Sequence, residues 1–380
     1  MRLVAATVYA LRIPFVESFR HSASDRRWSD SVVVRVRDDA GHEGYGEGTP
    51  RPYVTGETVE TMVDHIAHEL WPRVAACEFP EGAGLADISA LVPDTRLAGA
   101  IAPHATRAAV EIAIVDCHLR RTARSLGAVL PPRRARVTYS GVITAGPIER
   151  AARHARQMRA VGLAHVKVKV GFDDDVARIT AVREALGPGV SLRLDANGAW
   201  TFERAVDVLD AVAPLGIAAV EQPLPRGPVS ELARLRQATT VPVMADESVV
   251  TLGDADALIA EKAVDFLNVR LSKCGGITRS LAIAARAFDA GVGVQIGSQV
   301  GETAILSAAG RHVIATLREV AFAEGSFGTL LLAEDVSVES IRFGHRGEAS
   351  VLTGPGLGIR VIEERLRQRA VAVRELTAER

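Results

Sequence analysis

The sequence predicts an α/β barrel, in particular a modified TIM barrel of the (β/α)7β type, with a smaller α+β capping domain before it. One observation is a repeat of short apolar runs that each end in a charged residue. The intervals are nearly constant, with 26 residues from Lys169 to Asp195, 26 to Glu221, 25 to Asp246 and 27 to Lys273. An interval of about 25 residues fits one strand, one helix and the two loops of a parallel βα unit. The second observation is that strand-like and helix-like runs alternate on both sides of this stretch.

The N-terminal part, residues 1–125, has the pattern of a small α+β domain. Apolar residues alternate over 3–13 and 31–36, and a DDAG turn leads into the run HEGYGEG, so we expect three antiparallel strands. Helical periodicity follows over residues 57–74 and 105–119. The GYGEG run does not indicate a dinucleotide site, because no helix opens at its third glycine.

Residues 126–335 carry the barrel pattern, in which eight expected strands alternate with seven expected helices. The strands are expected over residues 137–143, 164–170, 191–196, 217–222, 241–246, 265–272, 292–297 and 319–324. The helices are expected over residues 147–160, 173–186, 202–213, 230–237, 255–262, 278–290 and 304–316. The remaining residues, 336–380, resemble strand and turn, and we expect them to return to the N-terminal domain.

The composition is that of an ordinary globular protein. The chain has 380 residues, of which 48% are hydrophobic and 24% charged, and its net charge is −1, which favours neither a nucleic-acid nor a membrane partner. The apolar stretch after Met1 is interrupted by Arg12 and Pro14, so we interpret it as a strand and not as a signal segment. Three scattered cysteines do not form a disulfide framework. These features predict a cytoplasmic protein.

The charged strand ends predict a metal site. The carboxyl ends of the strands in such a barrel meet at one mouth, so the carboxylates of Asp195, Glu221 and Asp246 should face one pocket together with three lysines. Such a buried cluster is costly unless its charges are compensated. Three oxygen donors favour a hard divalent cation, Mg²⁺ first and Mn²⁺ as the alternative. A single Asp at a strand end is more often a turn or helix cap, but five consecutive units in phase favour the site.

The segments KVKVG, LRLDANGAW, VEQP, ADES and LSKCGG, in this order and spacing, resemble the signature of the enolase superfamily and, within it, of the muconate-lactonizing-enzyme branch. The resemblance covers the barrel, and VVVRVRDDAGHEGYGEGTP followed by TGET is similar to the capping domain of that family. It implies removal of the proton next to a substrate carboxylate, with a divalent cation stabilising the charge of the resulting enediolate. It also implies that Asp195, Glu221 and Asp246 hold this cation.

The resemblance further implies roles for the lysines. Lys169 and Lys273 are expected on opposite faces of the substrate carbon as acid and base, and Lys167 is expected to support the carboxylate electrostatically. Asn197 and Glu247 are expected to orient the metal ligands or Lys169.

Substrate contacts are expected from two regions. In the resembled family, the loops of the capping domain fold over the barrel mouth, where they exclude water and select the substrate. Residues 18–28 are expected to form such a loop, although a basic cluster is more often a solvated turn, and Glu324 could equally be an exposed loop residue. The candidates are Arg20, His21, Tyr53, Gln295, Ser298, Glu302 and Glu324.

The sequence constrains the overall reaction less than it constrains the first step, the removal of the proton. Two bases permit racemisation or epimerisation, whereas one base and one acid permit cycloisomerisation or β-elimination. The segment EGSFGTLLLAED resembles cycloisomerases more than dipeptide epimerases, which carry an Asp-x-Asp pair there. We therefore expect a muconate-type cycloisomerase that acts on a small carboxylate, and a homo-oligomer as in many relatives. The alternatives are a racemase or epimerase of N-acyl amino acids or dipeptides, a hydroxy-acid dehydratase, and a catalytically silent barrel used for binding.

Overall fold

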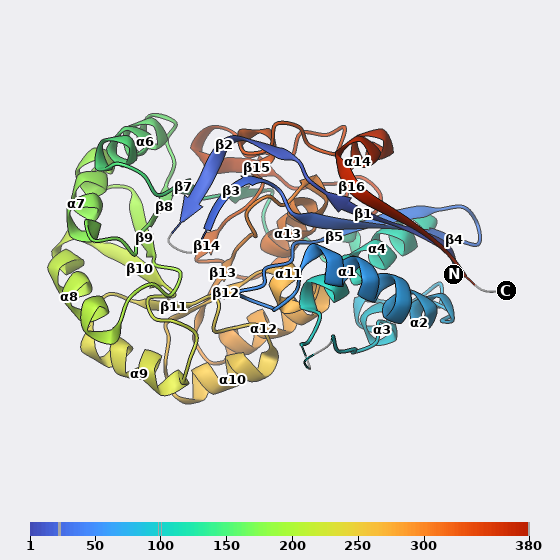
Figure 1. Cartoon of the computed structure of the whole chain (residues 1–380), viewed down its shortest axis with the longest axis horizontal. Coiled ribbons are helices and arrows are strands. Elements are labelled where there is room, and N and C mark those ends of the chain that lie inside the picture. The colour runs from blue at the N-terminus through green and yellow to red at the C-terminus, as the bar shows by residue number, and fades with distance from the viewer. Residues whose placement is uncertain (22–23, 98, 100, 379–380) are drawn as a thin grey trace.

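The computed structural model describes the chain except for residues 22–23, 98, 100 and 379–380, and it does not describe the side chains of residues 20–25. Figure 1 shows two parts, a barrel surrounded by an arc of helices and a smaller sheet flanked by helices, with the N-terminus at the end of the smaller part.

Within the described residues, eight parallel neighbouring strands form the barrel in the order β14-β13-β12-β11-β10-β9-β8-β7. They are β7 (Gly141–Ile143), β8 (His165–Lys169), β9 (Ser191–Asp195), β10 (Ile217–Glu221), β11 (Val243–Ala245), β12 (Phe266–Val269), β13 (Gly293–Ile296) and β14 (Phe322–Ala323). The backbone N–H of Ser140, next to β7, donates to the carbonyl of Ala323 at 2.8 Å and closes the ring. The predicted barrel is confirmed.

The barrel helices follow the expected alternation. They are α6 (Ile148–Ala160), α7 (Asp175–Leu186), α8 (Phe202–Val212), α9 (Val229–Ala238), α10 (Leu252–Ala260), α12 (Ile277–Asp289) and α13 (Ala304–Thr316). A short turn, α11 (Leu271–Cys274), precedes α12. Inside the barrel, Ala219, Met244 and Phe322 form a separate apolar cluster. On the strands of these three residues, the next inward-facing side chain toward the carboxyl end is polar. The candidate reactive groups therefore lie at the carboxyl ends of the strands.

The capping sheet contains the three predicted strands and a fourth. β1 (Leu3–Leu11), β4 (Ser31–Asp38) and β5 (Glu43–Gly48) pair as an antiparallel meander. The additional strand β16 (Ala370–Thr377) comes from the other end of the chain and pairs antiparallel with β1. Residues 370–377 therefore complete the sheet to which β1 belongs.

The glycines of the GYGEG run have a packing role. Helix α4 (His104–Arg121) lies directly on β5, and an added Cβ at Gly46 would meet the main-chain carbonyl of Ala109 and the amide of Ala113. A side chain at this position would push the helix off the sheet. This close approach, and not a nucleotide, accounts for the glycines.

We expect the substitution Gly46→Ala to lower the free energy of unfolding by at least about 2 kcal/mol, because rigid backbone cannot move away from the new methyl group. Chemical denaturation would measure this loss. Gly189→Ala is the matched control, because an added Cβ there meets nothing within 4 Å. Equal effects of the two substitutions would contradict the packing argument.

The structure corrects two expectations. Residues 18–21 and 24–28 are not loop but belong to β2 (Pro14–His21) and β3 (Ser24–Trp28), which pair antiparallel with Phe19 opposite Arg26, while residues 22–23 lie outside the described residues. The expected first barrel strand is split: β6 (Arg136–Thr138) pairs with β15 (Glu348–Ser350), and only β7 joins the barrel. The chain changes partners between Tyr139, which bonds to Gly347, and Ser140, which bonds to Ala323.

The remaining elements complete the capping part and the tail. The expected helix over 57–74 consists of α1 (Val59–His65), a π-helical turn over Ile66–Leu70 and α2 (Trp71–Ala75). The others are α3 (Leu85–Leu91), α5 (Leu126–Val129) and α14 (Glu363–Arg369), the last of which lies in a tail expected to be strand and turn. None of the helices in the described residues is both long enough and apolar enough to span a bilayer.

Candidate active site

Four predicted site residues lie at the carboxyl ends of adjacent barrel strands. Lys169 is paired in register with Asp195, and Asp195 with Glu221, so the last residues of β8, β9 and β10 lie side by side. Asp246 follows the last residue of β11. The three carboxylate side chains are almost completely buried. The structure thus brings these residues together into one row, which we call the carboxylate row (Asp195, Glu221 and Asp246), with Lys169 at its β8 end.

Lys167 lies among three carboxylates. Its Nζ is 3.0 Å from Asp195 Oδ2 and 2.8 Å from Glu324 Oε2, and it donates to both carboxylate oxygens of Glu221 at 3.3 Å. Burial alone would lower the pKa of Lys167, but the three negative charges outweigh it and raise this pKa well above its ordinary value. Lys167 is therefore a permanent positive charge in the barrel interior.

Lys169 has fewer partners. Its Nζ donates to Asp195 Oδ2 at 2.6 Å and to Asn197 Oδ1 at 2.8 Å. The Asn197 amide in turn donates to Glu247 Oε1 at 3.1 Å, which fixes which way the amide points. Burial raises the pKa of Glu247 to about 7, and the charges of Asp246 and Asp195 add to this shift. Asn197 and Glu247 are thus placed where they can orient the Lys169 ammonium group.

Lys273 has a different environment from the other two lysines. Its Nζ donates to the main-chain carbonyls of Asp246 and Asn268 at 2.6 and 2.8 Å, and to Asp246 Oδ1 at 2.7 Å. Its side chain is fully buried. All three ammonium hydrogens are bonded here, two of them to backbone, and the expected role of Lys273 as acid–base partner of Lys169 stays a prediction.

Sequence reasoning missed Arg270, which follows the last residue of β12. Its Nη2 is 3.1 Å from Glu221 Oε1 and also bonds to Asp246 Oδ2, and its Nη1 donates to Gln299 Oε1 at 3.2 Å. Side chains of a strand point alternately inward and outward, so the position of Arg270 could have been inferred from Asn268, two residues earlier. Asn268 points inward, and its Nδ2 donates to Glu221 Oε1 at 2.9 Å. The Arg270 guanidinium thus lies at the β12 end of the carboxylate row and bonds to two of its carboxylates.

Glu324 and Gln295 lie inside the barrel. Glu324 is 5% exposed and bonds to Lys167 and, at 3.1 Å, to Arg193 Nη2, so it is not an exposed loop residue. Burial would raise the pKa of Glu324, but these cations lower it. Gln295 donates to Glu221 Oε2 at 3.0 Å and accepts from the buried Arg193. Both side chains hold the charged network, and substrate contact by Glu324 or Gln295 stays a prediction.

The other substrate candidates lie around the mouth. Ser298 and Glu302 lie on the loop after β13. Glu302 accepts a bond from the Gln299 amide at 2.5 Å, and the removal of its carboxyl group from water raises the pKa of Glu302 to about 8. Tyr53 lies after β5 and is 46% exposed. Arg20 and His21 belong to β2, but their side chains lie outside the described part of the structure.

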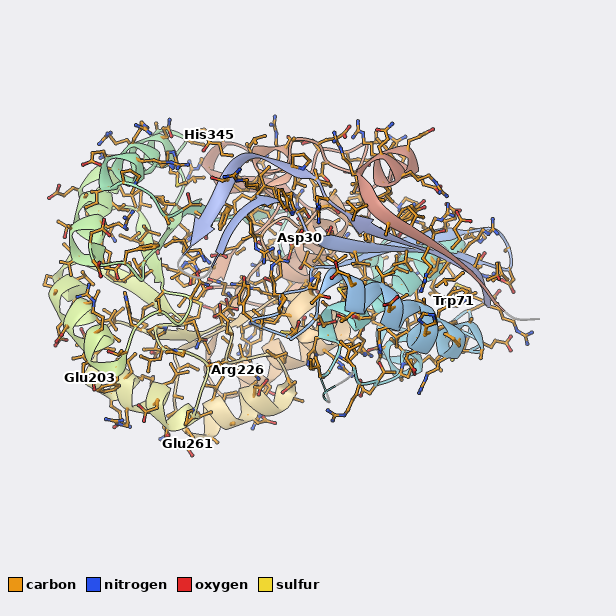
Figure 2. All side chains as sticks on the ribbon, viewed as in Figure 1. Asp30, Trp71, Glu203, Arg226, Glu261 and His345 are labelled. Atoms are coloured by element: carbon orange, nitrogen blue, oxygen red, sulfur yellow. The ribbon has the colours of Figure 1, made fainter. Side chains whose placement is uncertain are left out.

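The capping domain contacts the mouth at several points. The Ser29 hydroxyl donates to the carbonyl of Gly301 at 2.7 Å, and the amide of Val16 donates to Leu331 at 2.8 Å. Arg226, which is labelled near the middle of Figure 2 on the loop after β10, donates to the carbonyl of Val54 at 3.4 Å. These contacts hold the β2–β3 hairpin and the loop after β5 over the strand ends, which limits the access of water.

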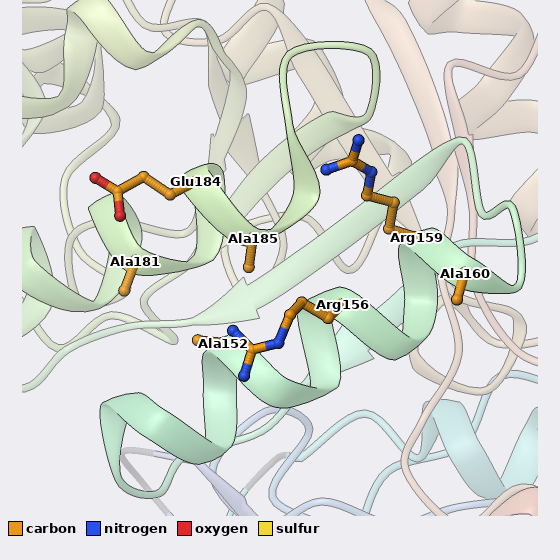
Figure 3. A pocket seen from close by; sticks show the side chains of 7 residues that line it. All are labelled: Ala152, Arg156, Arg159, Ala160, Ala181, Glu184 and Ala185. Carbon is orange, nitrogen blue, oxygen red and sulfur yellow. The ribbon is translucent and has the colours of Figure 1, made fainter.

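A hollow lies on the molecule away from the strand-end residues. It has a volume of about 630 Å³ and lies between α6 and α7 on the outer wall of the barrel (Figure 3). Alanines form its floor, and Arg156, Arg159 and Glu184 line its rim. Because it contains none of the strand-end residues, it is separate from the site.

The donor set of the carboxylate row fits Mg²⁺. It offers carboxylate oxygens and no sulfur or imidazole, and Glu247 Oε2 is a buried oxygen without a hydrogen-bond partner among the described residues. The described residues contain no group of three His, Cys, Asp and Glu side chains already gathered as a metal cradle. Arg270 and the three lysines bond to the oxygens of the carboxylate row, so an ion bound there would displace some of those contacts.

Comparison with known proteins establishes the class. The family described as Enolase C-terminal domain-like matches residues 150–365, which is more than half of the chain. The chain belongs to this family. It is an enzyme of the enolase superfamily, of the isomerase type, and its relatives include muconate cycloisomerases.

Individual relatives cover almost the whole chain. It is 31% identical to the L-Ala-D/L-Glu epimerase of Bacillus subtilis strain 168, over 94% of this chain and 97% of the relative. It is 30% identical to muconate cycloisomerase 1 of Rhodococcus opacus, over 94% and 96%. A crystal structure of the dipeptide epimerase from Cytophaga hutchinsonii, complexed with Mg and the dipeptide D-Ala-L-Val, is similar with a TM-score of 0.87 and 28% identity, over 100% of both chains. Two reaction types thus occur at nearly equal similarity.

Proposed function

We propose that this chain is a Mg²⁺-dependent enzyme that removes the proton next to the carboxylate of a small acid, and that its overall reaction is a cycloisomerisation of the muconate type. The observation that carries the proposal is the row formed by Asp195, Glu221 and Asp246 on neighbouring strands, with Lys169 at one end. The proposal includes a cytoplasmic location and a homo-oligomer, which follow from the sequence expectations.

The carboxylate row and the two lysines beside it have separate tasks in this proposal. Asp195, Glu221 and Asp246 would hold Mg²⁺, whose positive charge stabilises the negative charge that develops on the substrate carboxylate. Lys169 accepts the proton, and its bonds to Asp195 and Asn197 fix the position of Nζ. Lys167 keeps its charge and stabilises the carboxylates around it.

The capping domain contributes exclusion of water. An enediolate is a strong base, and water in the site would protonate it without selectivity. The contacts of Ser29 and Arg226 with opposite parts of the domain boundary keep the mouth covered. Substrate entry therefore requires movement of the β2–β3 hairpin or of the loop after β5.

The test is a conversion in deuterium oxide with saturating Mg²⁺ and cis,cis-muconate as the probe. We expect a lactone that carries deuterium on the methylene carbon next to its carboxylate, detected by proton NMR and mass spectrometry. The substitution Lys169→Ala should remove this product, and Lys262→Arg, on the exposed surface, is the control. Unchanged muconate with the wild-type protein would contradict cycloisomerisation of this substrate.

Epimerisation of a dipeptide is the second candidate. It is favoured by the relatives, since the L-Ala-D/L-Glu epimerase of Bacillus subtilis is as similar to this chain as the muconate cycloisomerase is. With L-Ala-L-Glu as the probe in deuterium oxide, an epimerase would give the opposite configuration at the exchanged carbon. A deuterated epimer, without any lactone from muconate, would therefore replace the first candidate by the second.

A further inference from the structure

The helices on the outer wall of the barrel differ in how their surface charges are paired. On α9 the exposed Arg234 bonds to Glu231 at 2.9 Å, and Arg286 of α12 bonds to Asp256 of α10 at 2.5 Å. These helices therefore present charges to solvent that are neutralised within the chain. The helices α6, α7 and α8, which follow one another along the arc in Figure 1, have a different arrangement.

Helix α6 presents a row of arginines to solvent. Arg153, Arg156 and Arg159 are exposed at intervals of three residues, and we call them the basic face. None of their guanidinium groups forms an ion pair or a hydrogen bond with a residue that the structure describes. Arg150 of the same helix does pair, with Glu17 of the hairpin at 3.1 Å. The basic face is thus a local positive charge that no described part of the chain neutralises.

Helix α8 presents the opposite charge. Glu203, Asp207 and Asp210 are exposed, and their spacing of four and three residues puts them on one side of the helix, which we call the acidic face. Glu203 is labelled on the outside of the arc in Figure 2. Among the described residues these three carboxylates also have no ion pair. One wall of the barrel therefore carries two unpaired faces of opposite charge, separated by a single helix.

The surface between the two faces is formed by small side chains. The hollow of about 630 Å³ between α6 and α7 has a floor of alanines, and Arg156 and Arg159 of the basic face lie on its rim (Figure 3). Glu184 of α7 is the acid on this rim, so the arginines outnumber it. An apolar floor within a charged rim is typical of a surface that a protein partner covers.

We propose that the wall formed by α6, α7 and α8 binds the same wall of a second copy of this chain, with α8 of each copy lying along the hollow between α6 and α7 of the other. A two-fold axis parallel to α7 produces this exchange, because it reverses the order of the three helices on the facing copy. Each acidic face then meets a basic face. The inference rests on the homo-oligomer named in the proposed function, for which it supplies the interface, and it does not depend on the reaction.

The heights of the charges on the wall agree with this axis. Rotation about an axis parallel to the helices leaves each residue at its own height. Arg153 lies five residues after the first residue of α6, and Asp207 lies five residues after the first residue of α8. Arg156 and Asp210 each lie eight residues after the first residue of their helices. Since barrel helices follow the carboxyl ends of the strands, these helices begin at the same end of the barrel, and the opposite charges lie at similar heights.

A second copy accounts for both faces at once. An acidic peptide or an unrelated acidic protein would neutralise the basic face but would leave the acidic face of α8 unpaired. A single exposed ion pair stabilises little. Several pairs around an apolar floor act together, and their arrangement also determines which partner is accepted. The chain itself carries the complementary charges at the matching heights, which favours a second copy as the partner.

The experiment reverses one charge on each face. Arg153→Glu and Asp207→Arg are made separately and together, with Arg234→Glu on α9 and Glu261→Arg at the end of α10 as controls of the same charge change. Sedimentation velocity over a range of protein concentrations measures the assembly in about 0.05 M salt, where screening is weak. Circular dichroism checks that each variant is folded. Deuterium exchange with cis,cis-muconate and Mg²⁺ is recorded on the same proteins.

We expect the wild type and both controls to form an assembly with an even number of copies. Each single reversal should raise the dissociation constant of the dimer at least about tenfold, because like charges then face each other at both symmetric contacts. The double variant should return to within about threefold of the wild type, since the exchanged charges attract again. An equal mixture of the two single variants should also assemble, because the two reversed faces attract each other and the two unchanged faces do so as well.

Three results would overturn the inference. A wild-type protein that stays monomeric at its highest soluble concentration leaves the hollow to another acidic partner and removes the homo-oligomer as well. An assembly that tolerates both single reversals is held together by a different surface. Single variants that dissociate but do not assemble when mixed have lost more than charge across the interface. The proposed reaction stands or falls separately, since absence of any deuterium exchange in an assembled wild type would remove that reaction and leave this interface in place.

Discussion

Replacing Lys273 by Ala should lower the free energy of unfolding by about 3–5 kcal/mol, since the buried Asp246 carboxylate loses one of its two cationic partners and two buried carbonyls lose their donor. The ammonium group joins the carbonyls of Asp246 and Asn268, which belong to the adjacent strand ends β11 and β12. It also bonds to the Asp246 carboxylate, whose pKa burial would raise but which Arg270 and Lys273 lower. The variant loses all of these interactions at once.

Chemical denaturation of the Lys273→Ala protein measures this loss. Lys262→Asn is a suitable control, because Lys262 is exposed and its φ of 50° is a left-handed conformation that Asn tolerates. We expect that control to change the free energy of unfolding by less than about 0.5 kcal/mol. If Lys273→Ala unfolded like the wild type but lost proton exchange, Lys273 would be a reacting group and not an anchor.

Replacing Asp195 by Asn should reduce turnover by at least about a thousandfold, which corresponds to about 4 kcal/mol of transition-state stabilisation. Asp195 is the last residue of β9 and lies within 3.0 Å of Lys167 Nζ and 2.6 Å of Lys169 Nζ. The substitution removes one charged oxygen from the carboxylate row and a charged acceptor from both lysines. The substitution thus weakens Mg²⁺ binding and at the same time shifts the Lys169 ammonium group.

The same variant has a readout that does not depend on turnover. Mg²⁺ that binds only the folded protein must raise the melting temperature, with a gain of about 2.7 kcal/mol when its concentration is a hundred times the dissociation constant. We expect the wild type to show this shift, EDTA to reverse it, and Asp195→Asn to lack it. Asp210→Asn, on the exposed face of α8, is the control. A wild-type protein without any shift at saturating Mg²⁺ would favour the silent barrel.

Much of the barrel could be predicted because its pattern is local. The run HVKVK alternates apolar and charged residues with the period of a strand, and the next acid follows after 26 residues, so the βα repeat and its phase are visible in the sequence. The carboxylate row follows from that phase, since strands of one parallel barrel end at one mouth. Side-chain roles on these residues remain predictions that the experiments above test.

The hairpin and the divided first strand could not be predicted in the same way. Residues 18–28 are rich in charge and resemble a solvated loop, and their pairing as β2 and β3 depends on support from the barrel mouth below them. In the segment 137–143, the exchange of partners between Tyr139 and Ser140 depends on Gly347 and Ala323, which are about two hundred residues away in the chain. No local pattern encodes a partner at that separation.

Sequence alone determined the type of barrel, the strand ends that carry acids, and the oxygen character of the candidate metal site, because strand period and repeat length are short-range properties. Only the tertiary structure decided which cation after β12 contacts both Glu221 and Asp246. The intervals from Asp246 to Arg270 and to Lys273 are both compatible with a βα repeat, but the main chain turns into α11 directly after Arg270. That turn directs Lys273 to backbone carbonyls and leaves Arg270 facing Glu221 and Asp246, since side-chain direction follows from the backbone path and not from spacing.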